Sequence, residues 1–339
     1  MTRRVFAGSC LLIVSLACMH AAAPGRPVST IAFVSTRDDV VTSPFLMSGE
    51  IYLMDGDGSN ARRLTDNKWG DGFPSISPDG QRVIFESNRF RRGDEPVNVS
   101  DLLVMNIDGS DQRRLVRGSS ATWSPDSRSI AFHASASGAG ALTRPHPGAA
   151  ASDSDIFVMN VDEFLRNGAP PKNITNNPAA VDDDADWSPD GKTIVFTSHS
   201  VTDDPIDSKT AELYTINADG TGPPTRLTHN EEEERAPAWS PDGKRIVFCC
   251  KRGGGRFEIC TINADGTGEM QLTHSTLPDL TPTWSPAGDK IAFHRPAGAR
   301  GSFQIWSMNS DGTGEAPLTT GPGWNAFPHW GQIRHRSTR

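Results

Sequence analysis

The segment PAWSPDGKRIVF, residues 237–248, decides the fold because close copies of it recur along the chain. The copies are ATWSPDSRSIAF at 121–132, ADWSPDGKTIVF at 185–196, PTWSPAGDKIAF at 282–293 and the variant PSISPDGQRVIF at 74–85. The anchor residues Ile76, Trp123, Trp187, Trp239, Trp284 and Trp330 are 47, 64, 52, 45 and 46 residues apart. Repeats of this length predict one supersecondary unit per copy.

Each unit predicts four short strands joined by tight turns. Ser-Pro-Asp-Gly after the anchor fits a type I turn, and an apolar β-rich run such as IVFTS at 194–198 follows it. A strand such as ELYTIN at 212–217 then leads to an Asp-Gly hairpin turn, here Asp219-Gly220, and to a short last strand. In the third unit, residues 162–172 form an insertion in place of the Asp-Gly turn.

Four-stranded units of this length are typical of a β-propeller, so the predicted fold is all-β with six blades of four antiparallel strands. The first unit begins at Ile31 and lacks an anchor strand, whereas the chain ends in such a strand at 327–330. We therefore predict that the C-terminal strand completes the first blade and closes a propeller over residues 29–333. The alternative is an open solenoid with unpaired edges.

The N-terminal segment predicts export. Residues 1–23 combine Arg3 and Arg4, an apolar stretch and three alanines, which is the pattern of a secretory signal peptide. We expect a periplasmic or extracellular protein. A membrane anchor, twin-arginine export and lipid attachment at Cys18 remain alternatives for this segment. Residues 334–339 are predicted to be a basic tail.

The charge of the chain favours basic partners. The formal net charge is −8, and removing Arg3 and Arg4 with the leader gives −8 − 2 = −10. Such a protein repels nucleic acid and anionic membrane surfaces. Beyond the leader, no apolar run is long enough to span a bilayer. We expect a monomer without an integral membrane span.

Three cysteines follow the leader: Cys249, Cys250 and Cys260. They lie on two adjacent predicted strands and form no CxxC motif, and the pattern favours three small buried hydrophobic residues. The alternative is one cross-strand disulfide, in which Cys260 pairs with either Cys249 or Cys250.

Acidic residues recur five positions before the anchors. In a propeller these positions lie around the mouth of the central channel, on the face that carries the long loops 36–49, 88–100, 135–154 and 199–211. A ring of carboxylates there would attract a basic peptide segment. Ca²⁺ is a weaker alternative because no DxDxDG loop is present, and turn capping is a third interpretation. The predicted binding residues are Asp71, Asp182, Asp183, Glu234, Asp279 and Asn325.

No motif indicates catalysis. The sequence contains no GxSxG, HExxH or P-loop motif. His229 and His274 follow the same Leu-Thr pair in two units, and His133 and His294 follow the Phe of equivalent strands, as repeat symmetry alone would place them. We therefore predict no catalytic residue, no metal site and no cofactor.

The repeat resembles that of the TolB-type, WD-like β-propeller family. The resemblance rests on P-x-W-S-P-D-G-K-x-I-x-F, followed by E-I-Y-x-M-N-x-D-G and R-L-T, and it covers about residues 31–330. It implies a periplasmic, non-enzymatic propeller that binds proteins of the cell envelope. TolB itself carries an α/β domain ahead of its propeller, whereas about ten residues separate the leader from the first strand here.

The leading hypothesis is therefore an exported, non-catalytic scaffold that binds an envelope protein or a basic peptide at its loop face and channel mouth. Related repeats also occur in peptidases, which need an attached hydrolase domain, and in lyases, which place metal-binding histidines at the channel. The alternative is accordingly a lyase or carbohydrate-active enzyme that uses the same mouth.

Overall fold

The computed structural model describes most of the chain between Pro27 and Arg334. The described ranges are 27–38, 49–93, 99–134, 154–200, 211–230, 232–253, 255–298, 302–321 and 323–334. The predicted leader 1–23, Cys18 and residues 335–339 lie outside these ranges, as do the central parts of the four long loops. The expectations for those segments stay predictions.

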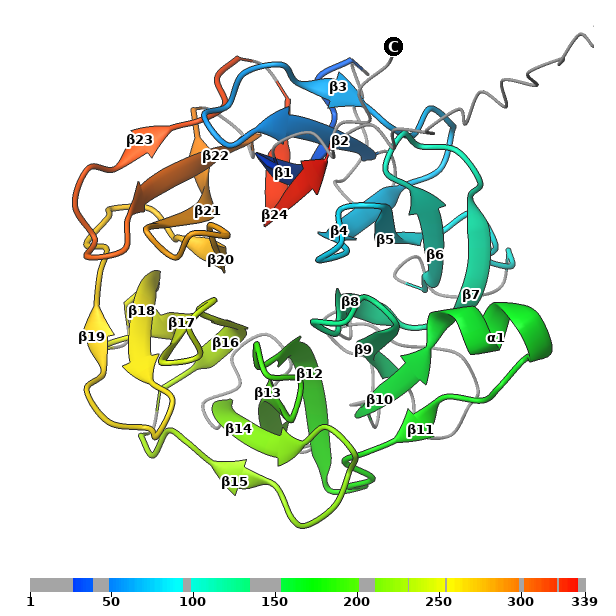
Figure 1. The fold of residues 1–339 in the computed structure, drawn as a ribbon. Coiled ribbons are helices and arrows are strands. Elements are labelled where there is room, and N and C mark those ends of the chain that lie inside the picture. The colour runs from blue at the N-terminus through cyan, green and yellow to red at the C-terminus, as the bar shows by residue number, and fades with distance from the viewer. Residues whose placement is uncertain are drawn as a thin grey trace, which may run out of the picture.

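Six four-stranded antiparallel sheets form a ring, and each sheet runs from an inner strand at the channel to a short outer strand (Figure 1). One blade contains β4 (Asp71–Ile76), β5 (Arg82–Ser87), β6 (Asp101–Asn106) and β7 (Arg113–Arg117). The second contains β8 (Ser119–Trp123), β9 (Ser129–Ala134), β10 (Asp155–Asn160) and β11 (Lys172–Asn173). The third contains β12 (Ala180–Trp187), β13 (Thr193–Ser200), β14 (Glu212–Asn217) and β15 (Thr225–Arg226). The fourth contains β16 (Glu234–Trp239), β17 (Arg245–Lys251), β18 (Phe257–Asn263) and β19 (Met270–Gln271). A fifth contains β20 (Leu280–Trp284), β21 (Lys290–Ala297), β22 (Ser302–Asn309) and β23 (Ala316–Pro317).

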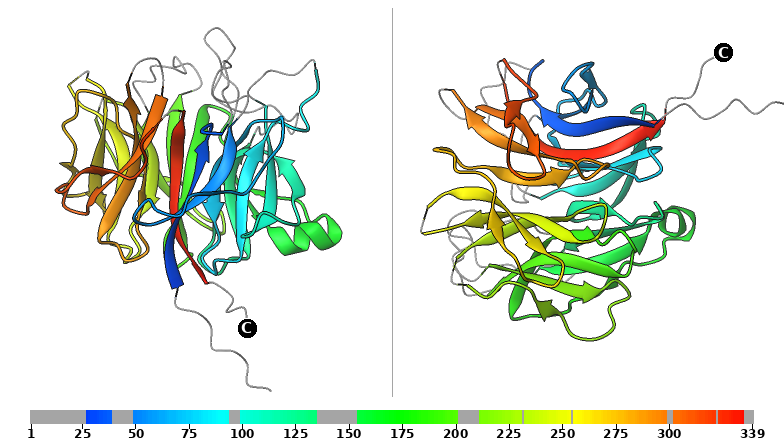
Figure 2. Two further views of the ribbon diagram at one scale, coloured as in Figure 1. Left: turned by 90° about the horizontal axis from the view of Figure 1, so that it is seen from above. Right: turned by 60° about the vertical axis from the view of Figure 1, so that its left-hand side comes forward.

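The sixth blade joins the two ends of the described chain. Its strands are β24 (Asn325–Arg334), β1 (Pro27–Ser35), β2 (Glu50–Asp55) and β3 (Arg62–Arg63), in that order from the channel outward. Trp330 lies opposite Ile31, and Ile333 opposite Val28. Figure 1 shows the red β24 beside the dark blue β1, and Figure 2 shows the two strands side by side from other directions. The predicted six-bladed propeller and its closure by the C-terminal strand are confirmed.

The Ser-Pro-Asp-Gly turn explains why the repeat keeps its sequence. Between β16 and β17, the Ser240 hydroxyl donates to the Asp242 carboxylate at 2.7 Å and accepts from the Arg245 amide at 2.9 Å. The same carboxylate accepts from the Lys244 amide at 3.1 Å, and Gly243 adopts a φ of 69°, which favours glycine. These bonds saturate the turn locally, so one sequence serves at several blades.

The anchor tryptophans pack between blades. Trp123 is buried against Ile84 and Leu102 of the preceding blade, and its Nε1 donates to the Ser75 carbonyl at 3.2 Å. Trp284 makes the same kind of bond, to the Ala238 carbonyl at 3.2 Å. Strands thus bury apolar residues on both faces, because each blade is covered by two neighbours.

The insertion in the third unit begins with a helix, α1 (Val161–Asn167). The Asn160 side chain accepts from the Glu163 amide at 2.9 Å, which caps the first turn, and Gly168 ends the helix with a φ of 71°. α1 projects from the ring beyond β10 and β11, on the outside of the molecule (Figure 1). It lies far from the channel.

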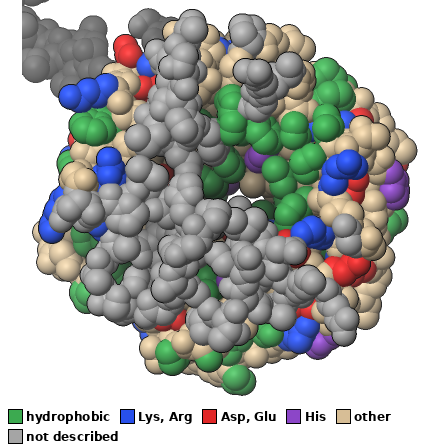
Figure 3. All heavy atoms as spheres, turned by 180° about the vertical axis from the view of Figure 1, so that it is seen from behind, with side chains coloured by type: hydrophobic (Ala, Val, Ile, Leu, Met, Phe, Trp, Pro, Cys, Tyr) green, Lys and Arg blue, Asp and Glu red, His purple; other side chains and the backbone are tan. Residues whose placement is uncertain are grey.

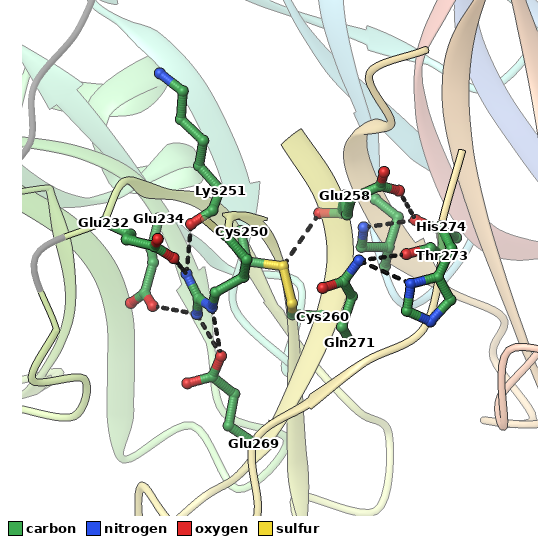
Figure 4. Close-up of a disulfide and its surroundings, with 12 residues drawn as sticks. Glu232, Glu234, Cys250, Lys251, Glu258, Cys260, Glu269, Gln271, Thr273 and His274 are labelled. Atoms are coloured by element: carbon green, nitrogen blue, oxygen red, sulfur yellow. Dashed lines mark hydrogen bonds and ion pairs between the residues drawn. A yellow bond between two sulfur atoms is a disulfide. The ribbon is translucent and has the colours of Figure 1, made fainter. Parts of the chain in front are cut away.

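The preferred interpretation of the cysteines was wrong, because Cys250 and Cys260 form a disulfide between β17 and β18 (Figure 4). Their Cα atoms are 5.8 Å apart, within the range that a disulfide spans. Cys249 is buried on the opposite face of β17, where its sulfur accepts from the Thr281 amide at 3.2 Å. The alternation of side chains along β17 therefore decides which of the two cysteines reaches Cys260.

Candidate functional site

A bulge at the same position in all six inner strands shapes the channel. The pairing with the second strand shifts register in each blade, and a non-glycine residue there adopts a positive φ of 46–52°. Each of these residues stands three positions before its anchor. They are Phe73, Ser120, Asp184, Ala236, Thr281 and Phe327.

This conformation is strained, most clearly for an aromatic or β-branched residue such as Phe73, Phe327 or Thr281. The cost is about 1–2 kcal/mol for each residue. A bulge re-aims the side chain that it carries. Here all six side chains line the channel, where they form a waist between two cavities.

The cavity on the loop side of the waist, called the mouth cavity below, has a volume of about 360 Å³. Figure 3 views the molecule from this face, and hydrophobic side chains cluster beside the central hollow. The two sides of the cavity differ in chemistry. The lining residues used below are Phe73, Glu86, Ser119, His133, Asp184, Arg235, Phe257, His294, Phe303, Trp324 and Phe327.

One wall of the mouth cavity is aromatic. The rings of Phe73 and Phe327 lie 4.0 Å apart between centroids, and those of Phe303 and Trp324 lie 4.7 Å apart. His294 links the two pairs, with its ring 5.1 Å from both Phe303 and Phe327. Burial lowers the pKa of His294 to about 3, so the ring is neutral at physiological pH. This wall offers a large apolar surface without charge.

The polar groups of the lining, called the polar wall below, are buried, and Glu86 lies beside Phe73 because it pairs with Gly72 in the same blade. The Glu86 carboxylate accepts from the Ser119 hydroxyl, from the Ser120 amide at 2.7 Å and from the Ser100 hydroxyl at 2.9 Å. Burial raises the pKa of Glu86 against these hydrogen bonds. Three hydrogen bonds thus fix the Glu86 side chain, and its carboxylate is a polar group with a fixed orientation.

Two further groups of this wall keep unused hydrogen-bonding capacity. The Nδ1 atom of His133 lies 3.7 Å from the Asp183 carboxylate, beyond hydrogen-bond distance, and the Nη2 atom of Arg235 is buried without a partner among the described residues. The guanidinium of Arg235 is held at its Nε atom, which donates to the Glu233 carboxylate. Buried polar atoms without partners are costly, and such atoms on a cavity wall indicate a ligand.

The residues predicted to form an acidic ring lie at equivalent positions near the starts of the inner strands, but most are buried and neutralised. Asp71 accepts from Arg89 at 2.9 and 3.0 Å, Glu234 from Arg252 at 2.6 Å, and Asp279 from Arg295 at 2.6 and 2.8 Å. Asn325 accepts from Arg37 at 2.9 Å. Of the six predicted residues, Asp71 lines the mouth cavity.

Asp182 differs from the arginine-paired residues because its hydrogen bonds come from Ser198 and Thr175. Burial raises the pKa of Asp182 to about 7, these hydrogen bonds act in the opposite direction, and the nearby Asp155 and Asp183 carboxylates add to the rise. Asp183 accepts from the Ser154 hydroxyl at 3.2 Å. Four of the six predicted residues are therefore paired with an arginine, and a role of these six residues in binding a peptide or Ca²⁺ stays a prediction.

The cavity on the other side of the waist, called the turn-end cavity below, has a volume of about 410 Å³. Its rim repeats one residue type, the proline of the Ser-Pro-Asp-Gly turn, at Pro78, Pro125, Pro189, Pro241 and Pro286. Besides Asp184 of the waist, two titratable residues line it, Asp186 and His329. Asp186 accepts from the Trp239 amide at 2.7 Å, and His329 accepts from the Ile76 amide at 3.2 Å. Both side chains therefore hold the backbone of a neighbouring blade.

Sequence reasoning missed the waist and the aromatic wall. The signal was available, because the residues three positions before the anchors differ from blade to blade while their surroundings repeat. Positions that vary within a conserved repeat unit of one chain mark the surface on which that chain has specialised.

Within the described residues, no three His, Cys, Asp or Glu side chains are placed to hold a metal ion. The described part of the chain also contains no helix with the length and apolar character needed to cross a bilayer.

A family model described as the TolB beta propeller domain matches residues 148–334. Among curated proteins, dipeptidyl-peptidase 5 of Porphyromonas gingivalis is 48% identical over 67 residues, which are 20% of this chain and 10% of that protein. An uncharacterized protein of Agrobacterium fabrum is 38% identical over 81 residues, 24% of this chain and 25% of that protein. These matches span a tenth and a quarter of the curated relatives.

Solved structures share the fold at low sequence identity. TolB from Acinetobacter baumannii has a TM-score of 0.68 at 19% identity, over 89% of this chain and 66% of that one. The putative TolB from Agrobacterium tumefaciens has a TM-score of 0.62 at 20% identity, over 92% of this chain and 100% of that one. An oligogalacturonate lyase from Vibrio parahaemolyticus has a TM-score of 0.51 at 12% identity, over 88% of this chain and 75% of that one.

Proposed function

The chain belongs to the TolB β-propeller family, and from this premise we propose that it is an exported, non-catalytic scaffold that binds a segment of a cell-envelope protein in the mouth cavity. The observation that carries the proposal is the presence of two kinds of lining in one cavity. Phe303, Trp324 and Phe327 offer an apolar surface, and Glu86, His133 and Arg235 add buried polar groups. Ligand pockets commonly combine a large apolar area with a few placed polar groups.

The location of the cavity supports a protein ligand. It opens on the loop face, and variable loops on a rigid frame usually carry binding function. Its volume of about 360 Å³ suits one or two side chains of an inserted loop or terminus. The rigid bulges at the waist hold the aromatic wall in place, so little conformational entropy is lost on binding.

The polar wall sets what the inserted segment must offer. The Nη2 of Arg235, which has no partner among the described residues, is a donor, so it needs an acceptor such as a backbone carbonyl or a carboxylate. Asp184 at the waist places a carboxylate in the same cavity. A segment that carries an aromatic or aliphatic side chain beside an exposed peptide bond satisfies both walls.

The test compares two phenylalanines in a pull-down of envelope partners with the purified mature protein. Phe303→Ala removes part of the aromatic wall and should lower partner recovery at least about tenfold, as loss of a buried aromatic anchor does. Phe90→Ala is the matched control, because Phe90 is 40% exposed and does not line the cavity. Equal recovery by both variants, with unchanged thermal midpoints, would contradict the proposal.

A lyase that uses the same mouth is the second candidate. The observation that favours it is that His133 and Glu86 both line the mouth cavity, with the Asp183 carboxylate 3.7 Å from His133, since titratable groups that share a cavity can transfer protons. Incubation with oligogalacturonate, the substrate in the name of one structural neighbour, would give an unsaturated product if this candidate holds. A His133→Ala variant should then lose that activity.

A further inference from the structure

Arginine occupies one recurring place in four of the six blades. In each case its guanidinium bonds the residue five positions before the anchor: Asn325, Asp71, Glu234 or Asp279. In the β16–β19 blade, Glu232 and Glu234 from one segment and Glu269 from another converge on this place (Figure 4), and all three contact Arg252. The arginines are Arg37, Arg89, Arg252 and Arg295.

The place has an aromatic side as well as an acidic one. Arg37 lies over the rings of Phe33 and Tyr52, at 5.1 and 5.3 Å from their centroids. Arg89 lies 5.6 Å from the ring of Phe85, which is equivalent to Phe33. A hydrogen-bond acceptor on one side and an aromatic ring on the other form a binding seat for a guanidinium. We call this arrangement the guanidinium seat.

The β12–β15 blade has the seat without the arginine. Asp182 stands at the acidic position, Phe196 and Tyr214 replace Phe33 and Tyr52, and Ser200 stands where Arg252 stands in the next blade. The aromatic pair keeps its geometry, with centroids 5.9 Å apart and planes at 31°, against 5.7 Å and 35° for Phe33 and Tyr52. The walls of the seat are therefore built as in the closing blade.

A cavity of about 690 Å³ lies at this place, and its lining includes Asp182, Phe196, Ser200 and Tyr214. Asp182 is 2% exposed, and its Oδ1 has no hydrogen-bond partner among the described residues. Arg226 also lines the cavity, but it donates to Glu212 and to the Thr228 carbonyl at 2.7 Å. A buried carboxylate oxygen in a cavity, with the neighbouring arginine already engaged, is an acceptor for a group from outside.

The electrostatic surroundings favour a cation. Burial favours the neutral form of Asp182, hydrogen bonds from Ser198 and Thr175 oppose it, and Asp155 and Asp183 add negative charge nearby. A bound guanidinium would reverse this effect, because an opposite charge within a few ångström stabilises the carboxylate. A guanidinium suits the seat better than an ammonium, since its planar face stacks on a ring while its edge donates to a carboxylate.

We propose that the β12–β15 blade binds the arginine side chain of a protein partner, with the guanidinium between Asp182 and the rings of Phe196 and Tyr214. The cavity shares no described lining residue with the mouth cavity, so this site is distinct from the one under Proposed function. The other blades show within the same chain how an arginine fills such a seat.

The test titrates the purified protein with N-acetyl-arginine N-methylamide and follows binding by NMR. The matched probe is N-acetyl-citrulline N-methylamide, which has nearly the same shape and no charge. The arginine probe should bind, and the citrulline probe should bind at least about tenfold more weakly. Asp182→Asn should weaken the arginine probe by a similar factor, whereas Asp66→Asn, at an exposed carboxylate, should leave it unchanged.

A second variant fills the seat from within. Ser200→Arg places an arginine at the position that three other blades fill with Arg37, Arg89 and Arg252, so it should block the probe and raise the thermal midpoint, and adding Asp182→Asn should abolish that rise. Failure of the wild-type protein to bind the arginine probe, equal binding of both probes, or full binding by Asp182→Asn would each overturn the proposal. If Ser200→Arg does not fold, the Asp182→Asn comparison decides. Loss of partner capture by Phe303→Ala has no bearing on this result.

Discussion

The two ends of the channel differ although the same six strands build both. At the turn end, the blades repeat one sequence, and prolines such as Pro189 and Pro241 form the rim. At the loop end, aromatic residues such as Phe303 face polar residues such as His133 across the mouth cavity. The blades share the same residues where these residues form the turns of the fold, and they carry different residues where the side chains line the mouth cavity.

This difference indicates which positions of a repeat protein can differ between repeats without loss of the fold. The turns at the turn end are satisfied internally, as Ser240, Asp242 and Lys244 show. Among the described residues, the buried polar atoms without a partner at the turn-end cavity belong to neutral side chains, Ser75, Trp187 and Trp239, whereas at the loop end they include those of ionisable side chains, Arg235 and Asp182. Unused buried capacity is expected where a ligand supplies the partner.

The largest effect is expected from removing the strand that contributes to both ends. Deleting residues 325–339 takes away β24, so β1 loses its inner partner and the waist loses Phe327. The loss should exceed the total stability of a typical domain, about 5–15 kcal/mol, and leave an unfolded or aggregated chain. Deleting 335–339 alone is the control, and it should preserve the β-sheet circular dichroism spectrum and a cooperative transition.

The arginine pairs at the loop end should make the next largest contribution. Asp279→Ala leaves Arg295 largely buried without its main partner, although Glu315 still accepts from it at 2.8 Å. The free energy of unfolding should fall by about 3 kcal/mol. Arg113→Ala, which breaks an exposed pair with Asp111 on an outer strand, should cause no measurable change. Urea denaturation of both variants checks this prediction, and equal midpoints would contradict it.

The disulfide should stabilise the β16–β19 blade. Cys260→Ser opens a loop with a sequence separation of 10 residues, and the free energy of unfolding should fall by about 2–3 kcal/mol. A reductant should lower the midpoint of the wild-type protein and leave that of Cys260→Ser unchanged. Cys249→Ala keeps the disulfide and should stay sensitive to the reductant. A wild-type midpoint that does not respond to the reductant would refute the bridge in solution.

The smallest effect concerns the pH dependence of β12, which carries a buried acid toward each end of the channel. Burial raises the pKa of Asp182 and that of Asp186 to about 7. The folded state therefore favours the protonated acids, and their contribution to stability is present below about pH 4 and lost as the pH rises through 7. The side chain that the variant Asp186→Asn introduces stays neutral at every pH. The thermal midpoint of this variant minus that of the wild type should therefore increase by a few degrees between pH 4 and pH 8, at about 2–4 °C per kcal/mol. Melting curves across this range test the sign, and a constant difference would contradict it.

Much of the fold could be predicted because it depends on local and repeated signals. The strand ELYTIN at 212–217 coincides with β14, and the C-terminal strand with Trp330 closes the ring as expected. Turn residues and alternating apolar positions carry this information within a few residues.

The site could be predicted only in part, because it depends on contacts between distant segments. The acidic positions were found, but their neutralisation by Arg89 or Arg252 depends on how far a side chain reaches across the blade. The positive φ at Phe73 or Thr281 could not be inferred from residue type, since both residues disfavour it. The choice of Cys250 over Cys249 required the pairing of β17 with β18.

The most direct measurement of the central claim compares the two ends of the channel by site-specific photocrosslinking. The crosslinking residue p-benzoylphenylalanine is placed at Phe303 in the mouth cavity or at Gln332, an exposed residue of the turn-end cavity. After illumination in envelope extract, the account predicts a discrete adduct from position 303 and none from position 332. An adduct from position 332 alone, or identical adducts from both positions, would contradict it.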